Sequence, residues 1–206
     1  MNSLLSVTDT IKYTFSTPIY SESINNFDNI QKEFYDVLGK VKFNYKEEWG
    51  NTHYLSDPSF NENIFEKYNL FNFKKELDNH LHSFIKHCNP NYNFEENDYY
   101  ISSSWFAKFK KNNYGHIHSH NDADIAGVYY IDNPAQKEVG QLFFDSPVVQ
   151  SEGSFIFKEY CTRINTNIPT GWIILFPGFL KHGITTNITD KERISFSFNI
   201  IFKKII

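Results

Sequence analysis

Three histidines and two aspartates fall within nine positions of this 206-residue sequence, in the stretch GHIHSHNDAD, directly before an apolar, β-branched run. His116, His118, His120 and Asp122 occupy alternate positions, so an extended segment places all four side chains on one side. Imidazole and carboxylate groups on one side are suitable ligands for a redox-active divalent metal whose other coordination positions stay open. The spacing therefore predicts a metal site here, completed by a ligand from a distant strand.

His182 is the candidate for that distant ligand. It follows an expected buried strand that ends at Phe176 and Pro177, in a turn that presents the histidine. Arg193 comes eleven residues later and opens the alternating strand RISFSFN. A guanidinium is permanently charged and matches a carboxylate bidentately, and Ser195 lies on the same strand face to add a hydroxyl. The pattern predicts an anion-binding pair beside the metal site.

The elements that must position these residues divide the chain into two halves. Apolar residues at helical spacing predict helices over 23–41 and 73–88, the second ending before Pro90. Short runs rich in β-branched and aromatic residues, separated by turn residues, predict an antiparallel sandwich or barrel. The expected strands are 99–110, 125–131, 141–144, 154–158, 171–176 and 193–202.

The last strand has two chemically different faces. Ile194, Phe196, Phe198 and Ile200 alternate with a polar set, Arg193, Ser195, Ser197 and Asn199. Antiparallel sheets often expose one face to water, which would make the polar set a solvated surface. The alternative is that the polar set points into a barrel that holds a charged ligand, with the N-terminal helices over the apolar face.

Composition limits the classes of function. The formal net charge is −4 and no Lys/Arg run stands out, so nucleic acid is not an expected partner. The N-terminus lacks the pattern of a signal peptide, and no stretch approaches the roughly 18 apolar residues that cross a bilayer, so a soluble cytoplasmic protein is expected. The two cysteines are far apart and lack CxxC spacing, so neither a disulfide framework nor a structural zinc site is indicated. The oligomeric state is not readable.

Five motifs between about residues 105 and 202 resemble a known family in their types and order. They are His118-Ser119-His120, Gly127-Val128-Tyr129-Tyr130, the G-x-L-x-F-x-x-P run from Gly140 to Pro147, the segment from Gly171 to His182, and Arg193 to Asn199. Together they resemble the 2-oxoglutarate/Fe(II)-dependent dioxygenase superfamily, and most closely the small 2OG-Fe(II) oxygenases of bacteria and their phages.

The resemblance implies a mainly β fold, a double-stranded β-helix (jelly roll) covered by N-terminal α-helices, with iron at its open mouth. We expect one domain over 1–206, with a supporting segment at 1–98 and a catalytic core at 99–206. The implied cofactors are Fe(II) and 2-oxoglutarate. His182 resembles the distal iron ligand, and Arg193 with Ser195 resembles the pair that binds the far carboxylate of 2-oxoglutarate, with Tyr130 as a further donor.

The first part of the metal site departs from the commonest pattern of the superfamily. Most members place His-x-Asp before the strand, whereas the nearest relatives carry His-x-His, and this chain offers both. The ligands are therefore His118, His120 and His182, or alternatively His120, Asp122 and His182. The resemblance to the nearest relatives favours His118, which leaves Asp122 to orient a ligand imidazole.

The implied activity is a dioxygenase reaction, expected to be a hydroxylation, that consumes O2 and gives succinate and CO2. The substrate is open between a protein side chain such as proline and a small metabolite. One alternative is a non-catalytic jelly-roll protein that binds a metal or takes part in assembly, and another is a metal-dependent isomerase on a cupin-like barrel. The helical histidines His80, His82 and His87 are expected at the surface.

Overall fold

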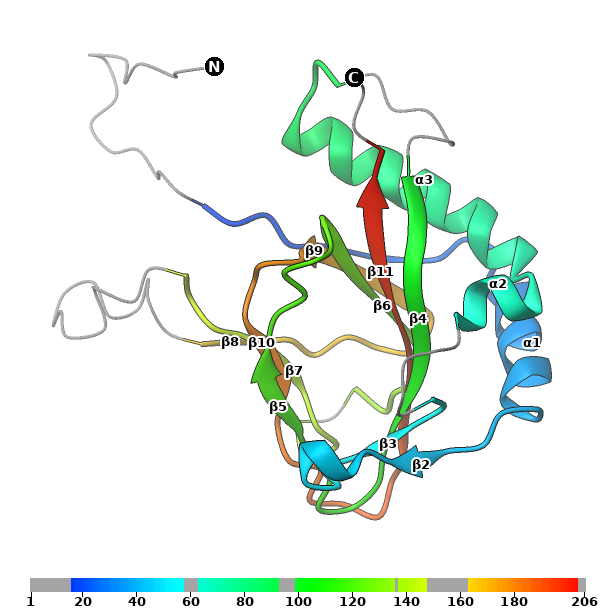
Figure 1. Ribbon diagram of the computed structural model, residues 1–206, viewed down its shortest axis with the longest axis vertical. Coiled ribbons are helices and arrows are strands. Elements are labelled where there is room, and N and C mark those ends of the chain that lie inside the picture. Colours follow the sequence, from blue (N-terminus) through cyan, green and yellow to red (C-terminus); the bar gives the residue numbers. More distant parts are fainter. Residues whose placement is uncertain (1–15, 58–62, 93–98, 136, 148–162, 204–206) are drawn as a thin grey trace, which may run out of the picture.

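The computed structural model describes residues 16–57, 63–92, 99–135, 137–147 and 163–203 (Figure 1). The helices are α1 (Phe27–Leu38), the 3-10 helix η1 (Glu47–Trp49), α2 (Ile64–Tyr68) and α3 (Phe71–Cys88). The strands are β1 (Tyr20–Ser23), β2 (Asn44–Tyr45), β3 (Tyr54–Leu55), β4 (Tyr99–Phe109), β5 (Gly115–His118), β6 (Ile125–Asp132), β7 (Leu142–Phe144), β8 (Ile164–Asn165), β9 (Trp172–Pro177), β10 (His182–Ile184) and β11 (Arg193–Phe202).

The strands form two antiparallel sheets. The larger has the order β1-β9-β6-β11-β4-β3-β2, and the smaller has the order β5-β10-β7-β8. Apolar residues between the two sheets form one core: Ala126, Val128, Tyr130, Leu142, Phe144, Ile174, Phe176 and Leu180. The mainly β, two-sheet architecture predicted from the strand spacing is confirmed. The strand expected over 154–158 lies outside the described residues.

A second core lies between the larger sheet and helices α1 and α3 (Figure 1). The ring of Phe34, in α1, lies 5.0 Å from the ring of Tyr129 in β6 and 5.0 Å from that of Phe196 in β11. Phe73, in α3, lies 5.6 Å from Phe196. Strand β6 is buried over all but its last residue, because the helices contact one face of its sheet and the smaller sheet contacts the other.

Helix α3 begins where a side chain of α1 supplies hydrogen-bond acceptors, and it ends ahead of a proline. The first amides of a helix have no intrahelical acceptor, and the Glu33 carboxylate of α1 accepts from the amides of Asn72 and Phe73, each at 3.0 Å. Helix α3 ends at Cys88, one residue before Asn89 and ahead of Pro90, as predicted. None of the helices in the described part of the chain is long and apolar enough to span a membrane.

One helical histidine does not lie at the surface as expected. His80 is 3% exposed, whereas His82 and His87 are exposed. Its Nδ1 lies 2.8 Å from the Tyr20 hydroxyl of β1, and its Nε2 lies 3.4 Å from Glu76 one helical turn away. His80 lies three residues after Leu77 and four before Phe84, on the buried face of α3, and its partner on β1 is remote in sequence.

Burial lowers the pKa of His80, against the opposing effect of the Glu76 and Glu22 carboxylates. Because the pKa in the folded state is below the unfolded value of about 6.5, the folded protein favours the neutral ring, and stability is lost as pH falls below that value. We therefore expect thermal unfolding midpoints to fall less between about pH 7.5 and about pH 5 in His80→Gln than in the wild type. The exposed His87→Gln on the same helix is the control, and equal slopes in all three proteins would refute the assignment.

The polar face of β11 points into the molecule. Arg193 and Ser195 are each 1% exposed, and both line the cavity between the two sheets together with Ser197 and Asn199. The alternating Phe196, Phe198 and Ile200 pack into the core formed with the helices. Of the two readings of this strand, the inward-facing polar set is correct.

Candidate active site

The fold brings His118, His120 and His182 together at one end of the smaller sheet. His118 ends β5 and His182 begins β10, and the two residues are directly opposed in the antiparallel pairing. Each of the three histidines offers one ring nitrogen, and these nitrogens lie within 4.8 Å of one another. Three imidazoles at this spacing fit a single divalent transition metal and leave its remaining positions open.

Backbone carbonyls fix the tautomers of two of these rings. Nδ1 of His182 lies 2.8 Å from the Leu180 carbonyl, and Nδ1 of His118 lies 2.8 Å from the His116 carbonyl. A carbonyl can only accept, so each Nδ1 carries the proton and donates it. The Nε2 lone pair of each ring is thereby left for a metal, in the arrangement typical of histidine ligands.

The three rings are neutral at physiological pH. Burial, followed by the neighbouring His118, lowers the pKa of His182 to about 3 and that of His120 to about 4. Burial also lowers the pKa of His118. Protons therefore do not compete for the ring nitrogens near neutral pH, because a metal ligand must be the unprotonated imidazole.

His120 joins His118 in this cluster, but the shared-side prediction is wrong for the two outer residues, His116 and Asp122. Strand β5 ends at His118, and a turn follows in which the Ala123 amide donates to the His120 carbonyl at 2.9 Å. The alternation of an extended chain is lost in this turn. Asp122 is exposed and lines a different pocket, and His116 directs Nε2 to the Trp49 carbonyl at 3.2 Å.

The turn that carries His120 rests against Gly178, which follows β9. The His120 amide donates to the Gly178 carbonyl at 2.8 Å, and the Gly178 amide donates to the Asp124 carbonyl at 3.1 Å. A Cβ atom at position 178 would lie 2.1 Å from the Ala123 carbonyl oxygen and 2.6 Å from that of His120. Only glycine permits this approach of two backbones.

Gly178→Ala should therefore displace the turn and weaken metal binding at least about tenfold, with a loss of stability of about 1–3 kcal/mol. Gly39→Ala is the matched control, because Gly39 has helical backbone angles and a Cβ there has no atom closer than 3.8 Å. Isothermal titration with Fe(II) under anaerobic conditions measures the difference. Wild-type affinity in Gly178→Ala would show that the turn does not set the position of His120.

Arg193 is a fully buried cation in the same cavity as the three histidines. Its Nε and Nη1 make no hydrogen bond with the described residues, and its Cζ lies 4.9 Å from the ring centroid of Phe109 and 5.0 Å from that of Tyr130. The Tyr130 hydroxyl, also buried, likewise has no hydrogen-bond partner among them. Burial lowers the pKa of Arg193 and raises that of Tyr130.

Burial of a guanidinium without a hydrogen-bonded anion costs several kcal/mol of folding free energy, and a bound anion offsets this cost. Ser195, on the same face of β11, lines the cavity and adds a hydroxyl. The sequence predicted Arg193, Ser195 and Tyr130 as neighbours of the metal site; Arg193 and Ser195 line the cavity, and the Tyr130 ring lies against Arg193. The donor set fits a carboxylate held in the cavity that the three histidines also line.

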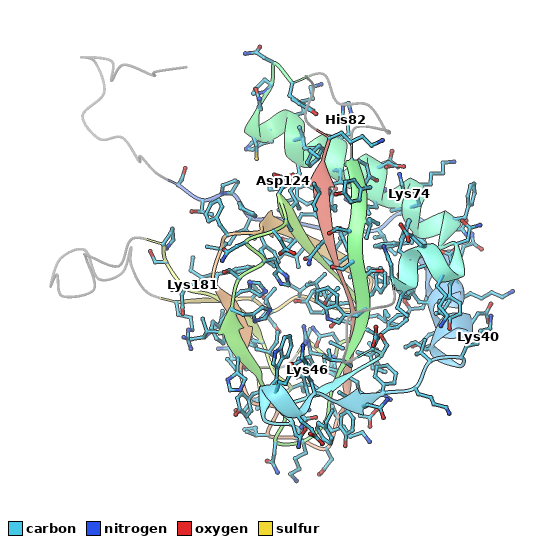
Figure 2. All side chains as sticks on the ribbon, viewed as in Figure 1. Lys40, Lys46, Lys74, His82, Asp124 and Lys181 are labelled. Carbon is cyan, nitrogen blue, oxygen red and sulfur yellow. The ribbon has the colours of Figure 1, made fainter. Side chains whose placement is uncertain are left out.

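Two further residues of this cavity escaped the sequence analysis. Trp49 and His53 line it, and both come from the segment around η1 and β3 (Figure 1). Lys46, labelled in Figure 2, directly precedes η1, and its ammonium lies 4.7 Å from the Trp49 ring centroid. The segment has strands of only two residues each, and its one local signal is Gly50, at φ 65°, which marks a turn after Trp49.

Residues 103–199 match the model of a protein family described as "Putative 2OG-Fe(II) oxygenase". A comparison with curated proteins finds no match. The matched segment begins within β4 and contains every residue predicted for the metal site and the anion pocket.

Solved structures with similar folds include HygX from Streptomyces hygroscopicus, with nickel, 2-oxoglutarate and hygromycin B bound, at TM-score 0.60 and 11% identity over 89% of this chain and 82% of that one. A Pseudomonas putida prolyl-4-hydroxylase has TM-score 0.56 and 12% identity over 92% of this chain and 94% of that one. The α-ketoglutarate-dependent epimerase SnoN from nogalamycin biosynthesis has TM-score 0.62 and 9% identity over 90% and 78%. All three share the jelly-roll architecture.

The family match and the shared fold agree with the two features of the cavity, a cluster of imidazoles and a buried cation that has no counter-ion among the described residues. Residues 103–199 match the 2OG-Fe(II) oxygenases, a group of oxidoreductases whose cofactors are Fe(II) and 2-oxoglutarate, and the chain has the fold of solved members of that group.

Proposed function

We propose that this protein is an Fe(II)- and 2-oxoglutarate-dependent hydroxylase, with His118, His120 and His182 as metal ligands and Arg193, Ser195 and Tyr130 as the binding site for the far carboxylate of 2-oxoglutarate. The single observation that carries the proposal is the buried Arg193, whose Nε and Nη1 have no hydrogen-bond partner among the described residues, in one cavity with three neutral histidines. A module that only binds a metal has no use for that cation.

The triad with His118 is the better supported of the two alternatives. His118 lies opposite His182 across the β5–β10 pairing, and its Nε2 is free because Nδ1 donates to a carbonyl. The alternative ligand Asp122 is exposed beyond the turn. Three neutral imidazoles leave a more positive metal centre than a triad with a carboxylate, and the bound dianion of 2-oxoglutarate offsets that charge.

The residues of the chain then have separate tasks in the reaction. Bound Fe(II) supplies the activation of O2 that the superfamily couples to oxidation of 2-oxoglutarate. The histidines hold the metal in a fixed geometry, since two of the three rings are oriented by backbone carbonyls. Arg193 neutralises and orients the cosubstrate, and the apolar walls formed by Trp105, Val128 and Phe176 exclude water from the cavity.

The expected products are succinate, CO2 and a hydroxylated substrate. The neighbouring structures include one with the small molecule hygromycin B bound and one prolyl hydroxylase, so the substrate class is a small molecule or a protein side chain. We also propose that the chain is a single domain, with a catalytic core at 99–206 and a supporting segment at 1–98 whose helices α1 and α3 cover the outer face of the larger sheet.

Detection of succinate tests the proposal without a known substrate. Metal-loaded protein at high concentration should convert 2-oxoglutarate slowly to succinate and CO2 when O2 is admitted, because these enzymes can decarboxylate the cosubstrate without a substrate. The reaction should require Fe(II) and should be lost in Arg193→Met. Complete recovery of 2-oxoglutarate after prolonged aerobic incubation with Fe(II)-loaded protein would contradict the proposed activity.

A further inference from the structure

His53 and Phe109 form a stacked pair beside the Arg193 guanidinium. The two rings are parallel to within 6°, and their centroids are 4.5 Å apart. Phe109 in turn lies 4.9 Å from Cζ of Arg193. Phe109 therefore contacts the histidine and the guanidinium, and His53 lies behind it as a support.

Backbone pairing and hydrogen bonds fix this arrangement. Phe109 is the last residue of β4 and is directly opposed to Arg193 of β11. The pairing of β3 with β4 places Tyr54 opposite Lys108, and so brings His53 next to Phe109. The Thr52 hydroxyl lies 3.0 Å from Nδ1 of His53, which holds the plane of the imidazole.

The guanidinium lies against two aromatic rings, Phe109 at 4.9 Å and Tyr130 at 5.0 Å from Cζ. Its Nε and Nη1 have no hydrogen-bond partner among the described residues, so polar contacts at these two atoms do not fix its plane. Aromatic faces attract a guanidinium with about 0.5–2 kcal/mol, more when water is excluded. Two hydrogen bonds to one carboxylate require the plane of the guanidinium to be set before binding.

Burial, followed by the charge of Arg193, lowers the pKa of His53 to about 4. The ring is therefore uncharged near neutral pH and adds no repulsion beside the guanidinium. His53 is 7% exposed and lines the same cavity as Arg193, yet it comes from a segment outside the family match at 103–199.

We propose that His53 is a positioning residue for the cosubstrate: acting through Phe109, it sets the plane of the Arg193 guanidinium and so gives the cavity its preference for a 2-oxo acid with a second carboxylate. The inference rests on the proposed function, because it concerns the same anion pocket. It assigns cosubstrate selectivity in part to the N-terminal segment around β3.

Two 2-oxo acids separate this role from general support of the fold. 2-Oxoglutarate and 2-oxovalerate have the same five-carbon chain, but 2-oxovalerate has a methyl group where 2-oxoglutarate has its far carboxylate. Anaerobic titration of the Fe(II)-loaded protein gives a Kd for each acid and hence a selectivity ratio. The wild type should favour 2-oxoglutarate strongly.

His53→Leu should lower that ratio about fivefold to tenfold, entirely through weaker binding of 2-oxoglutarate, with unchanged affinities for Fe(II) and 2-oxovalerate. His53→Phe keeps a planar ring against Phe109 and should keep the ratio within about twofold of the wild type. Equal weakening for both acids, or an unchanged ratio in a folded His53→Leu protein, would overturn the inference.

Phe109→Leu provides an independent variant in case His53→Leu does not fold, as judged by circular dichroism. It removes the ring that contacts the guanidinium, so the ratio should fall at least as far as expected for His53→Leu. A wild-type ratio in Phe109→Leu also overturns the inference. A wild-type protein whose Fe(II) form binds neither acid would instead overturn the proposed function, and the inference with it.

Discussion

His182→Ala should reduce Fe(II) affinity by about a hundredfold or more and abolish activity. His182 is the most deeply buried of the three histidines, and its Nε2 is directed by the hydrogen bond from Nδ1 to the Leu180 carbonyl. Its replacement leaves only two neutral nitrogens in the cluster. Metal content after dialysis and anaerobic titration calorimetry measure the loss.

The matched comparison is between His118→Ala and Asp122→Ala. His118 lies in the cluster, whereas Asp122 is exposed beyond the turn, so only the first change should release the metal. Asp122→Ala should bind Fe(II) within about threefold of the wild type, since it removes an exposed charge near His120 and no ligand. Loss of iron in Asp122→Ala with full retention in His118→Ala would reverse the choice of triad.

Arg193→Met should weaken 2-oxoglutarate binding about a hundredfold or more, without lowering the stability of the ligand-free protein. A charge-assisted bidentate contact in a dry cavity contributes several kcal/mol to binding, and each 1.4 kcal/mol is a factor of ten. In the absence of the ligand the same guanidinium is a buried charge with no counter-ion in the described part of the chain, which costs free energy. The unfolding midpoint of the apo variant should therefore be equal to the wild-type value or higher.

Arg163→Met is the control for this prediction, because the chain has two arginines and Arg163 is the partnered one. Its Nε lies 2.8 Å from Asp145 on the surface, and its side chain is 43% exposed. This change should leave 2-oxoglutarate affinity at the wild-type value. Calorimetry with the Fe(II)-loaded proteins gives the affinities, and thermal unfolding gives the stabilities. A destabilised apo Arg193→Met with normal 2-oxoglutarate binding would make Arg193 a structural charge.

The parts of the fold that the sequence predicted are those with a strong local period. In strand β11 apolar and polar residues alternate. Phe196 and Phe198 pack into the core with the helices, whereas Ser195 and Ser197 line the cavity. Alternation alone left the polar face open between solvent and ligand. The burial of Arg193 shows that the polar face points toward the cavity and not toward solvent. That burial depends on the second sheet, and the pattern within one strand does not reveal it.

The errors arose where a remote segment overrides a local pattern. His80 was expected at the surface as a helical histidine, although it lies three residues after Leu77 on the buried face of α3, where strand β1 brings the Tyr20 hydroxyl against it. The alternation of residues 116–122 predicted one shared side, but the turn held by Gly178 ends the extended conformation after His118. His53 reaches the cavity through pairing of a two-residue strand, which is too short to leave a period in the sequence.

Anaerobic titration with Fe(II) and 2-oxoglutarate tests the central claim most directly, because it examines the metal site and the anion pocket together. Chelation of Fe(II) by a 2-oxo acid gives a visible charge-transfer band that neither component gives alone. We predict a band that saturates at one equivalent of each component and is absent from His182→Ala. Absence of the band from wild-type protein that has bound Fe(II) would contradict the account and favour a metal-binding jelly-roll protein without oxygen chemistry.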